Sequence, residues 1–330
     1  MSGRHFIVQG EEPLLQYLFT TLAPTSRTEI RNMLSKGMIQ VNGQSVTLHS
    51  HPLRKGDRVE VLPKAVSIAR ATTDDARDEV EKSGVKIVFE DDNYIVVDKP
   101  SGLLTVSTAN GSAAKKGRKE KTLYALLNAY IKVSARMQRK EDLATGKEPD
   151  RSTAKIWIVH RLDKGTSGLV IFAKNERSKD ILQSKWKDLV LERTYTAWLE
   201  GRLEKKEGAV QSWLKENEKS LKMHSFKEET KDAQLAITHY KVICFGKRGP
   251  MQFTKAQFSL QTGRKNQIRV HAADLGHPIT GDDKYGAQYN PLHRLALHAG
   301  TLVFHHPYTG KTVRLASPVP EQFAIIEEIS

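Results

Sequence analysis

The hydrophobic pattern near the start of the chain predicts two helices followed by short strands. Apolar residues recur at helical spacing over residues 13–22 and again over 27–35. Ser26 and Glu29 form a capping box before the second stretch, because a hydroxyl and a carboxylate three residues apart satisfy free backbone N–H groups. An Asn-Gly pair at 42–43 follows a short apolar run and predicts a hairpin turn. This region is therefore expected to be a compact α+β module.

A change in composition separates this module from the rest of the chain. Residues 66–84 are small, polar and charged and show no apolar periodicity, which is typical of a linker. We therefore expect three parts: a module at 1–65, a linker at 66–84 and a larger domain at 85–330.

The larger domain combines predicted strands with an amphipathic helix. Apolar runs at 156–159 and 169–173 predict buried strands, and the pattern over 176–190 predicts the helix. Alternating apolar and polar positions predict further strands at 195–199, 237–243 and 253–260. This mixture is compatible with an α+β fold.

The charge balance points to a polyanionic partner. In a chain of 330 residues, 52 Lys and Arg stand against 38 Asp and Glu, which gives a net charge of +14. Nucleic acid is the first candidate partner for such a chain. Nine Lys and Arg against one acid fall between residues 115 and 140, beginning with Lys115, Lys116, Arg118 and Lys119. Such a run is usually a solvated face, but at this net charge phosphate contact is the favoured interpretation.

Other features exclude several classes of protein. A single cysteine, Cys244, rules out a disulfide framework and a Cys-rich zinc site and suits a reducing compartment. The start lacks a signal-peptide pattern and no apolar run approaches roughly 18 residues, so we expect a cytoplasmic protein without membrane contact. Histidine pairs at 49/51 and 305/306 lack a third ligand, so no metal is predicted. No phosphate-binding loop or dinucleotide motif is present, so no nucleotide or other cofactor is implied.

The strongest candidate chemistry lies in residues 159–175, where two apolar runs flank a polar loop. Asp163 is in this loop between Arg161 and Lys164, and nearby positive charge favours its ionised form. Such a carboxylate can act as a nucleophile or as a base. Alternatively, Asp163 caps a turn beside Gly165, which is the more common role of an isolated loop aspartate.

A second polar cluster lies at residues 261–287. A helical pattern that begins near residue 268 puts Arg264 and Lys265 at a helix N-terminus, where the macrodipole disfavours cations. A phosphate or a buried carboxylate at that point would resolve the conflict. Arg269, about a turn further on, is either a surface cation or the partner of a buried acid, and the sequence leaves both open.

Together these motifs resemble the RluA-type family of RNA pseudouridine synthases over nearly the whole chain. HRLDKGTSGL at 160–169 matches the family's catalytic-aspartate motif, RTYTAWLEG at 193–201 its second motif and TGRKNQIRVH at 262–271 its third. EDDNYIVVDKPSGL at 90–103 and GHPITGDDKYG at 276–286 fit its opening and closing segments. Asn266 stands in the third motif where many members have His. Residues 12–62 resemble the small RNA-binding module of ribosomal protein S-four, with SRTEIRNMLSKGMIQVNGQ as its signature stretch.

The resemblance implies a fold and a chemistry. The fold is an α+β pseudouridine-synthase domain with a mixed, largely antiparallel sheet and an active-site cleft, preceded by a small α+β RNA-binding module. Uridine must be detached from its ribose at N1, turned and rejoined at C5. Asp163 would supply the catalytic carboxylate, Arg269 would hold it ionised, and Tyr195 would stack near the uracil and accept the C5 proton directly or through water. Whether Asp163 attacks the sugar or removes a ribose proton is left open.

RNA recognition would use basic residues from several parts of the chain. The target nucleotide must leave its stack, and Arg161 resembles the family residue that fills the vacated place. The other predicted RNA contacts are Arg264, Lys265, Arg27, Arg31, Lys115, Lys116, Arg118 and Lys119.

The predicted function is pseudouridine formation in structured RNA, with ribosomal RNA as the expected substrate and monomeric action as the simpler assumption. One alternative is a non-catalytic RNA-binding or ribosome-assembly factor on the same fold, which does not need Asp163. Another is carboxylate chemistry on a free nucleoside, which neither the charge nor the additional module favours.

Overall fold

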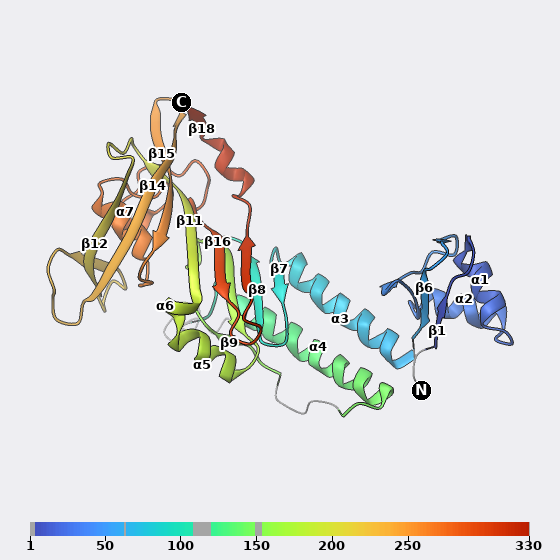
Figure 1. Ribbon diagram of the computed structural model, residues 1–330. Coiled ribbons are helices and arrows are strands. Elements are labelled where there is room, and N and C mark those ends of the chain that lie inside the picture. The colour runs from blue at the N-terminus through green and yellow to red at the C-terminus, as the bar shows by residue number, and fades with distance from the viewer. Residues whose placement is uncertain (1–3, 63, 108–119, 149–153, 330) are drawn as a thin grey trace. The chain divides into compact units, whose positions relative to one another are not determined.

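The computed structural model describes residues 4–62, 64–107, 120–148 and 154–329 (Figure 1). The chain forms two compact units, one of Met1–Ser83 with Leu127–Lys155 and one of Gly84–Leu126 with Ile156–Ser330. The four predicted RNA contacts at 115, 116, 118 and 119 lie outside the described residues. No helix of the described part is both long and apolar enough to cross a membrane.

The first unit contains a small antiparallel sheet and two short helices. The sheet order is β1 (Arg4–Ile7), β6 (Arg58–Val61), β3 (Ile39–Val41) and β4 (Gln44–Ser45), and β2 (Glu12–Pro13) pairs separately with β5 (Pro52–Leu53). The helices are α1 (Leu14–Thr21) and α2 (Arg27–Ser35), which confirms both predicted helices. Leu18, Ile30 and Val59 are among the fully buried residues that join helices to sheet.

Local signals in this unit act as the sequence predicts. The Ser26 hydroxyl accepts a hydrogen bond from the Glu29 backbone N–H at 3.2 Å, which caps α2. Asn42 and Gly43 have φ values of 52° and 83° between β3 and β4. Positive φ at both central positions is what a type I′ hairpin turn requires.

A helix occupies most of the region expected to be a linker. Helix α3 (Lys64–Lys82) covers most of residues 66–84. Ala, Arg, Lys and Glu, which favour helix, make up ten of its nineteen residues, and Arg77 pairs with Glu81 one turn later at 3.3 Å. Apolar periodicity alone did not predict this helix, because the helix propensity of its residues carries the signal. That the segment acts as a linker stays a prediction.

The second unit is built on a single mixed sheet that has twelve strands among the described residues. The main path runs β13 (Met223–Phe226), β12 (Glu207–Glu216), β14 (Gln234–Arg248), β15 (Met251–Leu260), β11 (Val190–Glu200), β16 (Leu297–His305), β10 (Ser167–Ala173), β8 (Tyr94–Lys99) and β7 (Lys86–Glu90). Three short strands pair off this path: β9 (Trp157–Ile158) with β10, β17 (Thr312–Ala316) with β16, and β18 (Glu327–Ile329) with β14. All the strand pairs are antiparallel except β10 with β16. The predicted α+β fold with a largely antiparallel sheet is confirmed.

Short helices complete the described part of this unit, together with the long helix α4 (Leu123–Thr145), which begins in it. The short helices are α5 (Glu176–Ser184), α6 (Trp186–Leu189), α7 (Gln267–Asp274), η2 (Asp283–Tyr285) and η3 (Glu321–Ile325). The helix predicted over 176–190 is interrupted at Lys185, whose φ of −107° and ψ of 27° are not helical. Val190 then begins β11 and lies opposite Phe304 of β16, so strand pairing overrides the amphipathic pattern at its end.

The order of strands brings three distant segments together. The loop that carries Asp163 leads into β10, Tyr195 lies on β11, and the segment after β15 leads into α7 with Arg269. Gly168 allows β10 to approach β16 closely, because a Cβ atom there would lie 2.1 Å from the Ala299 carbonyl oxygen. Its φ of +109° also excludes most other residues.

Candidate active site

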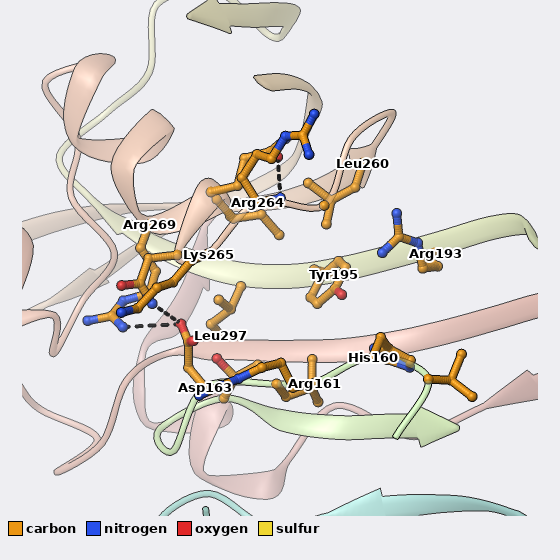
Figure 2. A pocket seen from close by; sticks show the side chains of 17 residues that line it. His160, Arg161, Asp163, Arg193, Tyr195, Leu260, Arg264, Lys265, Arg269 and Leu297 are labelled. Atoms are coloured by element: carbon orange, nitrogen blue, oxygen red, sulfur yellow. Dashed lines mark hydrogen bonds and ion pairs between the residues drawn. The ribbon is translucent and has the colours of Figure 1, made fainter. Parts of the chain in front are cut away.

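A cavity of about 370 Å³ lies where these three segments meet. Six predicted site residues line it: Arg161, Asp163, Tyr195, Arg264, Lys265 and Arg269. In Figure 2, Asp163 and Arg269 lie toward one side of the cavity, His160 and Arg193 toward the other, and Tyr195 between them. The structure therefore assembles the residues that the three motifs contribute separately.

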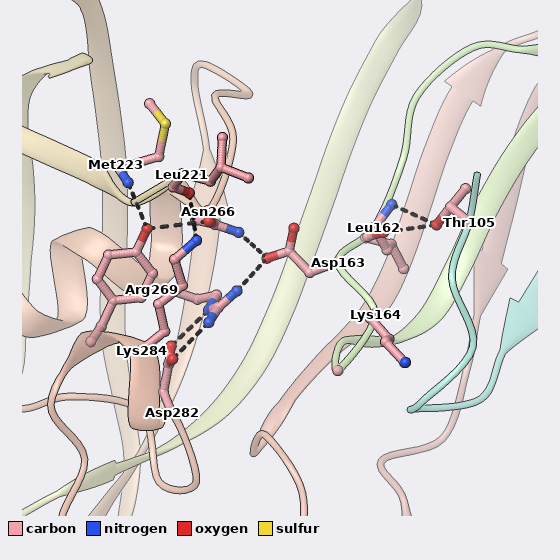
Figure 3. A network of polar contacts seen from close by, with 12 residues as sticks. Thr105, Leu162, Asp163, Lys164, Leu221, Met223, Asn266, Arg269, Asp282 and Lys284 are labelled. Atoms are coloured by element: carbon pink, nitrogen blue, oxygen red, sulfur yellow. Dashed lines mark hydrogen bonds and ion pairs between the residues drawn. The ribbon is translucent and has the colours of Figure 1, made fainter. Parts of the chain in front are cut away.

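The Asp163 carboxylate receives two hydrogen bonds at one oxygen (Figure 3). Oδ2 accepts from Asn266 Nδ2 at 2.6 Å and from Arg269 Nη1 at 3.1 Å. The Asp163 side chain is 26% exposed and the Arg269 side chain 14%. The carboxylate is thus paired with a cation while it stays open to the cavity.

The Arg269 guanidinium is held from behind by a second, buried acid. Nε and Nη2 donate to the two oxygens of Asp282, each at 2.7 Å, and the Asp282 side chain is only 1% exposed. Burial opposes the charged form of Arg269, but the hydrogen bonds and negative charge of Asp282 and Asp163 outweigh it, so the pKa of Arg269 is raised. Of the two roles left open for Arg269, the structure selects the partner of a buried acid.

Tyr195 presents a neutral phenol to the cavity. The residue is 7% exposed, on β11. Burial raises the pKa of the Tyr195 hydroxyl, and the positive charge of Arg193 only partly offsets this. The hydroxyl therefore keeps its proton at neutral pH.

Carboxylates resolve the conflict at the start of α7. Arg264 and Lys265 are exposed, and α7 begins after them at Gln267. Lys265 forms an ion pair with Glu216, and Arg264 Nε donates to the Leu235 carbonyl at 3.0 Å. Asp163 is hydrogen-bonded to Asn266, the N-cap residue of α7. Its carboxylate therefore places negative charge near the N-terminus of the helix, where the macrodipole favours it.

Two bases fix the loop that carries Asp163, the buried Lys99 and the half-buried His160, and sequence reasoning assigned neither of them a role. Lys99 is fully buried, and its Nζ donates to the carbonyls of Pro100 and Leu103 at 2.9 Å and of Lys164 at 3.3 Å. Burial lowers the pKa of Lys99 to about 7. At the other end of the loop, His160 Nε2 accepts from the Ile171 backbone N–H at 3.2 Å, and burial lowers the pKa of His160 to about 3. His160 is therefore neutral in the fold.

Asn266, Asp282 and Tyr285 were also missed as site residues. Asn266 was noticed only as a departure from the family pattern, although it contacts Asp163 directly. Asp282 has an acidic neighbour, Asp283, and no pattern reveals that the first is buried and the second exposed. The Tyr285 ring lies 5.0 Å from the Arg269 guanidinium carbon, a contact that depends on the tertiary fold.

The two remaining predicted RNA contacts belong to the first unit. Arg27 and Arg31 are exposed on α2. Their guanidinium carbons lie 5.1 and 5.6 Å from the centre of the Phe19 ring. Cation–π contact of this kind pre-orients both cations while leaving them accessible.

Comparison with known proteins identifies the family. A family model described as RNA pseudouridylate synthase matches residues 93–274. An uncharacterized RNA pseudouridine synthase of Bacillus subtilis, YhcT, is 31% identical over 92% of this chain and 90% of its own length. The ribosomal large subunit pseudouridine synthase D of Nitrosomonas europaea is 29% identical over 94% of this chain and 82% of its own length.

A solved structure supports the same fold. The human RNA pseudouridylate synthase domain containing 1 superposes with a TM-score of 0.55 at 21% identity, over 74% of this chain and 89% of its own. The fold, the match of the family model and the similarity to YhcT over most of both chains agree. The chain belongs to the RNA pseudouridylate synthase family and is an RNA pseudouridine synthase.

Proposed function

We propose that this enzyme converts uridines of ribosomal RNA to pseudouridine with Asp163 as its catalytic carboxylate. The observation that carries the proposal is the Asp163–Arg269–Asp282 arrangement beside Tyr195 in the cavity. Ribosomal RNA is supported by relatives named ribosomal large subunit pseudouridine synthase D.

Asp163 acts on the ribose of the target uridine. During the reaction the N1–C1′ bond breaks, a C5–C1′ bond forms, the C5 proton leaves and N1 gains a proton. An ionised carboxylate assists either by attacking C1′ or by removing a ribose proton, and in both routes the ion pair with Arg269 orients the carboxylate. Asp282 keeps the guanidinium in place, since its two hydrogen bonds leave Nη1 for Asp163.

Tyr195 supports the base while it turns. Its ring offers a flat face for the uracil. Burial keeps the Tyr195 hydroxyl protonated. The hydroxyl therefore accepts the C5 proton only while it donates its own proton to another group. The C5 proton leaves through this hydroxyl or through a neighbouring water.

Basic residues hold the RNA around this site. Arg161 is exposed at the rim of the cavity and would fill the place of the flipped nucleotide. Arg264 and Lys265 would contact phosphates nearby. Residues 1–65 would act as an RNA-binding module of the ribosomal protein S-four kind through Arg27 and Arg31. Monomeric action and a cytoplasmic location stay predictions from sequence.

The test uses purified enzyme with ribosomal RNA transcripts made from [5-³H]uridine. Pseudouridine formation releases the C5 hydrogen, so we expect tritium in solution with the wild type and none with Asp163→Asn, which keeps the shape of the side chain. Asp163→Asn should still bind the transcript. Tritium release by Asp163→Asn at the wild-type rate contradicts the catalytic role of Asp163. Release by the wild type from transfer RNA or free uridine, but not from ribosomal RNA, contradicts ribosomal RNA as the substrate.

A further inference from the structure

The two oxygens of the Asp163 carboxylate are in different environments. Oδ2 accepts both hydrogen bonds, from Asn266 and from Arg269. Oδ1 makes no hydrogen bond to any residue that the structure describes, and Figure 3 shows it pointing away from the donors. The carboxylate is therefore fixed at one atom and open at the other.

A relay of hydrogen bonds sets the direction of the Asn266 amide. The Met223 backbone N–H donates to the Tyr285 hydroxyl oxygen at 3.1 Å. Since a backbone N–H can only donate, the Tyr285 hydrogen is available for Asn266 Oδ1, 3.2 Å away. The carbonyl end of the amide thus faces Tyr285, and the NH₂ end faces Asp163.

Asn266 gives up an ordinary structural role to make this contact. It precedes α7 at the N-cap position, where Asn commonly accepts a hydrogen bond from the first turn of the helix. Here its side chain makes no capping bond, its φ is 54°, and it is 9% exposed. In the loop before the helix, the Arg264 backbone N–H donates to Gln267 Oε1 at 2.9 Å. A local rule broken at a buried polar residue is typical of a functional site.

We propose that Asn266 is a positioning residue, oriented by Tyr285, that together with Arg269 fixes Oδ2 of Asp163 and leaves Oδ1 to react with the ribose. The inference rests on the proposed catalytic role of Asp163. Asn266 would be a second donor to Asp163 beside Arg269, and Oδ1 would be the oxygen that reacts.

The first test compares Asn266→Asp with Asn266→His in steady-state reactions on a ribosomal RNA transcript. Asp has the same shape and also tolerates a left-handed backbone, but it turns an acceptor toward Oδ2. We expect kcat to fall about 10- to 100-fold, as for the loss of one hydrogen bond to a charged group, at unchanged KM. His also tolerates this backbone and keeps an N–H donor, so Asn266→His should stay within about threefold of the wild type.

A second pair of variants separates positioning from folding. Asn266→Gly suits a φ of 54° and removes the donor without adding charge, so its kcat should fall as in Asn266→Asp at a similar melting temperature. Tyr285→Phe keeps the ring beside Arg269 and removes only the hydroxyl. It should lower kcat about 3- to 10-fold, whereas Tyr289→Phe, at a 43% exposed tyrosine, should not.

The outcomes distinguish this inference from the proposed function. If Asp163→Asn is inactive while Asn266→Asp and Asn266→Gly both match the wild type, the positioning role is wrong and the role of Asp163 stands. A loss confined to KM also overturns the inference, because it places Asn266 in RNA binding. If Asp163→Asn is active, the proposed function fails first.

Discussion

At the scale of single residues, Tyr195 offers the sharpest separation of chemistry from binding. Tyr195→Phe keeps the ring that we propose supports the base and removes the hydroxyl that we propose passes on the C5 proton. We expect kcat to fall by about 10² to 10⁴, the usual contribution of a positioned proton-transfer group, with the dissociation constant for RNA unchanged. Steady-state kinetics beside a filter-binding titration measure both. Turnover within threefold of the wild type would exclude the proton-transfer role.

The Arg269–Asp282 pair gives a prediction that links stability with activity. Arg269→Met leaves the buried Asp282 carboxylate without its cation, which should lower the free energy of unfolding by about 3–5 kcal/mol. The double variant Arg269→Met/Asp282→Leu should recover most of that loss, because no buried charge remains unpaired. It should stay inactive, since Asp163 still lacks Arg269. Urea unfolding and the tritium assay test this together, and an active double variant would contradict it.

Sequence reasoning found those site residues that motifs carry and missed those that only the fold brings near. Asp163 and Arg269 stand out because long motifs surround them. Asp282 and Tyr285 reach the site through the loop and short helix that follow α7, and Lys99 reaches it from β8. Burial of a charged side chain is a tertiary property, so neither Lys99 nor Asp282 differs in sequence from an exposed residue.

At the scale of elements, the close approach of β10 to β16 depends on Gly168. Gly168→Ala places a methyl group against the Ala299 carbonyl at a φ of +109°, so we expect a loss of at least about 3 kcal/mol in the free energy of unfolding. Gly300→Ala on β16 is the matched control, because its Cβ would meet only ordinary contacts at 3.7 and 3.8 Å. Chemical denaturation of both proteins measures the difference. Equal stability would show that the strands can separate without cost.

Elements were predicted well where the local pattern and tertiary structure agree. The bounds of α2 follow its cap and its apolar spacing, and every residue of β10 is buried as the apolar run indicates. The helix α3 was not predicted, because the signal used was apolar periodicity and not helix propensity. The helix predicted over 176–190 was too long, because β11 takes Val190 into the sheet. Pairing with β16 is non-local, so the sequence around Val190 does not reveal it.

At the scale of the whole molecule, buried histidines make stability depend on pH. His271 lies between the hydroxyls of Ser212 and Thr238 at 3.0 and 2.8 Å, and burial lowers its pKa to about 4. As pH falls below about 6.5 the unfolded chain binds a proton there and the folded chain does not, so stability falls until about pH 4. The contribution is about 1.4 kcal/mol per pH unit. Urea unfolding from pH 7 to 4.5 should show a shallower fall for His271→Gln than for wild type, and no change for exposed His224→Gln.

Pseudouridine mapping of total RNA tests whether Asp163 carries the modification of ribosomal RNA in cells. It compares cells that carry the wild-type protein, none, or Asp163→Ala. We predict that specific uridines of ribosomal RNA lose the modification both without the protein and with Asp163→Ala, and keep it with the wild type. Ribosomal RNA sites that stay modified with Asp163→Ala but disappear without the protein would contradict the account, because the chain would then act on them without its proposed catalytic carboxylate.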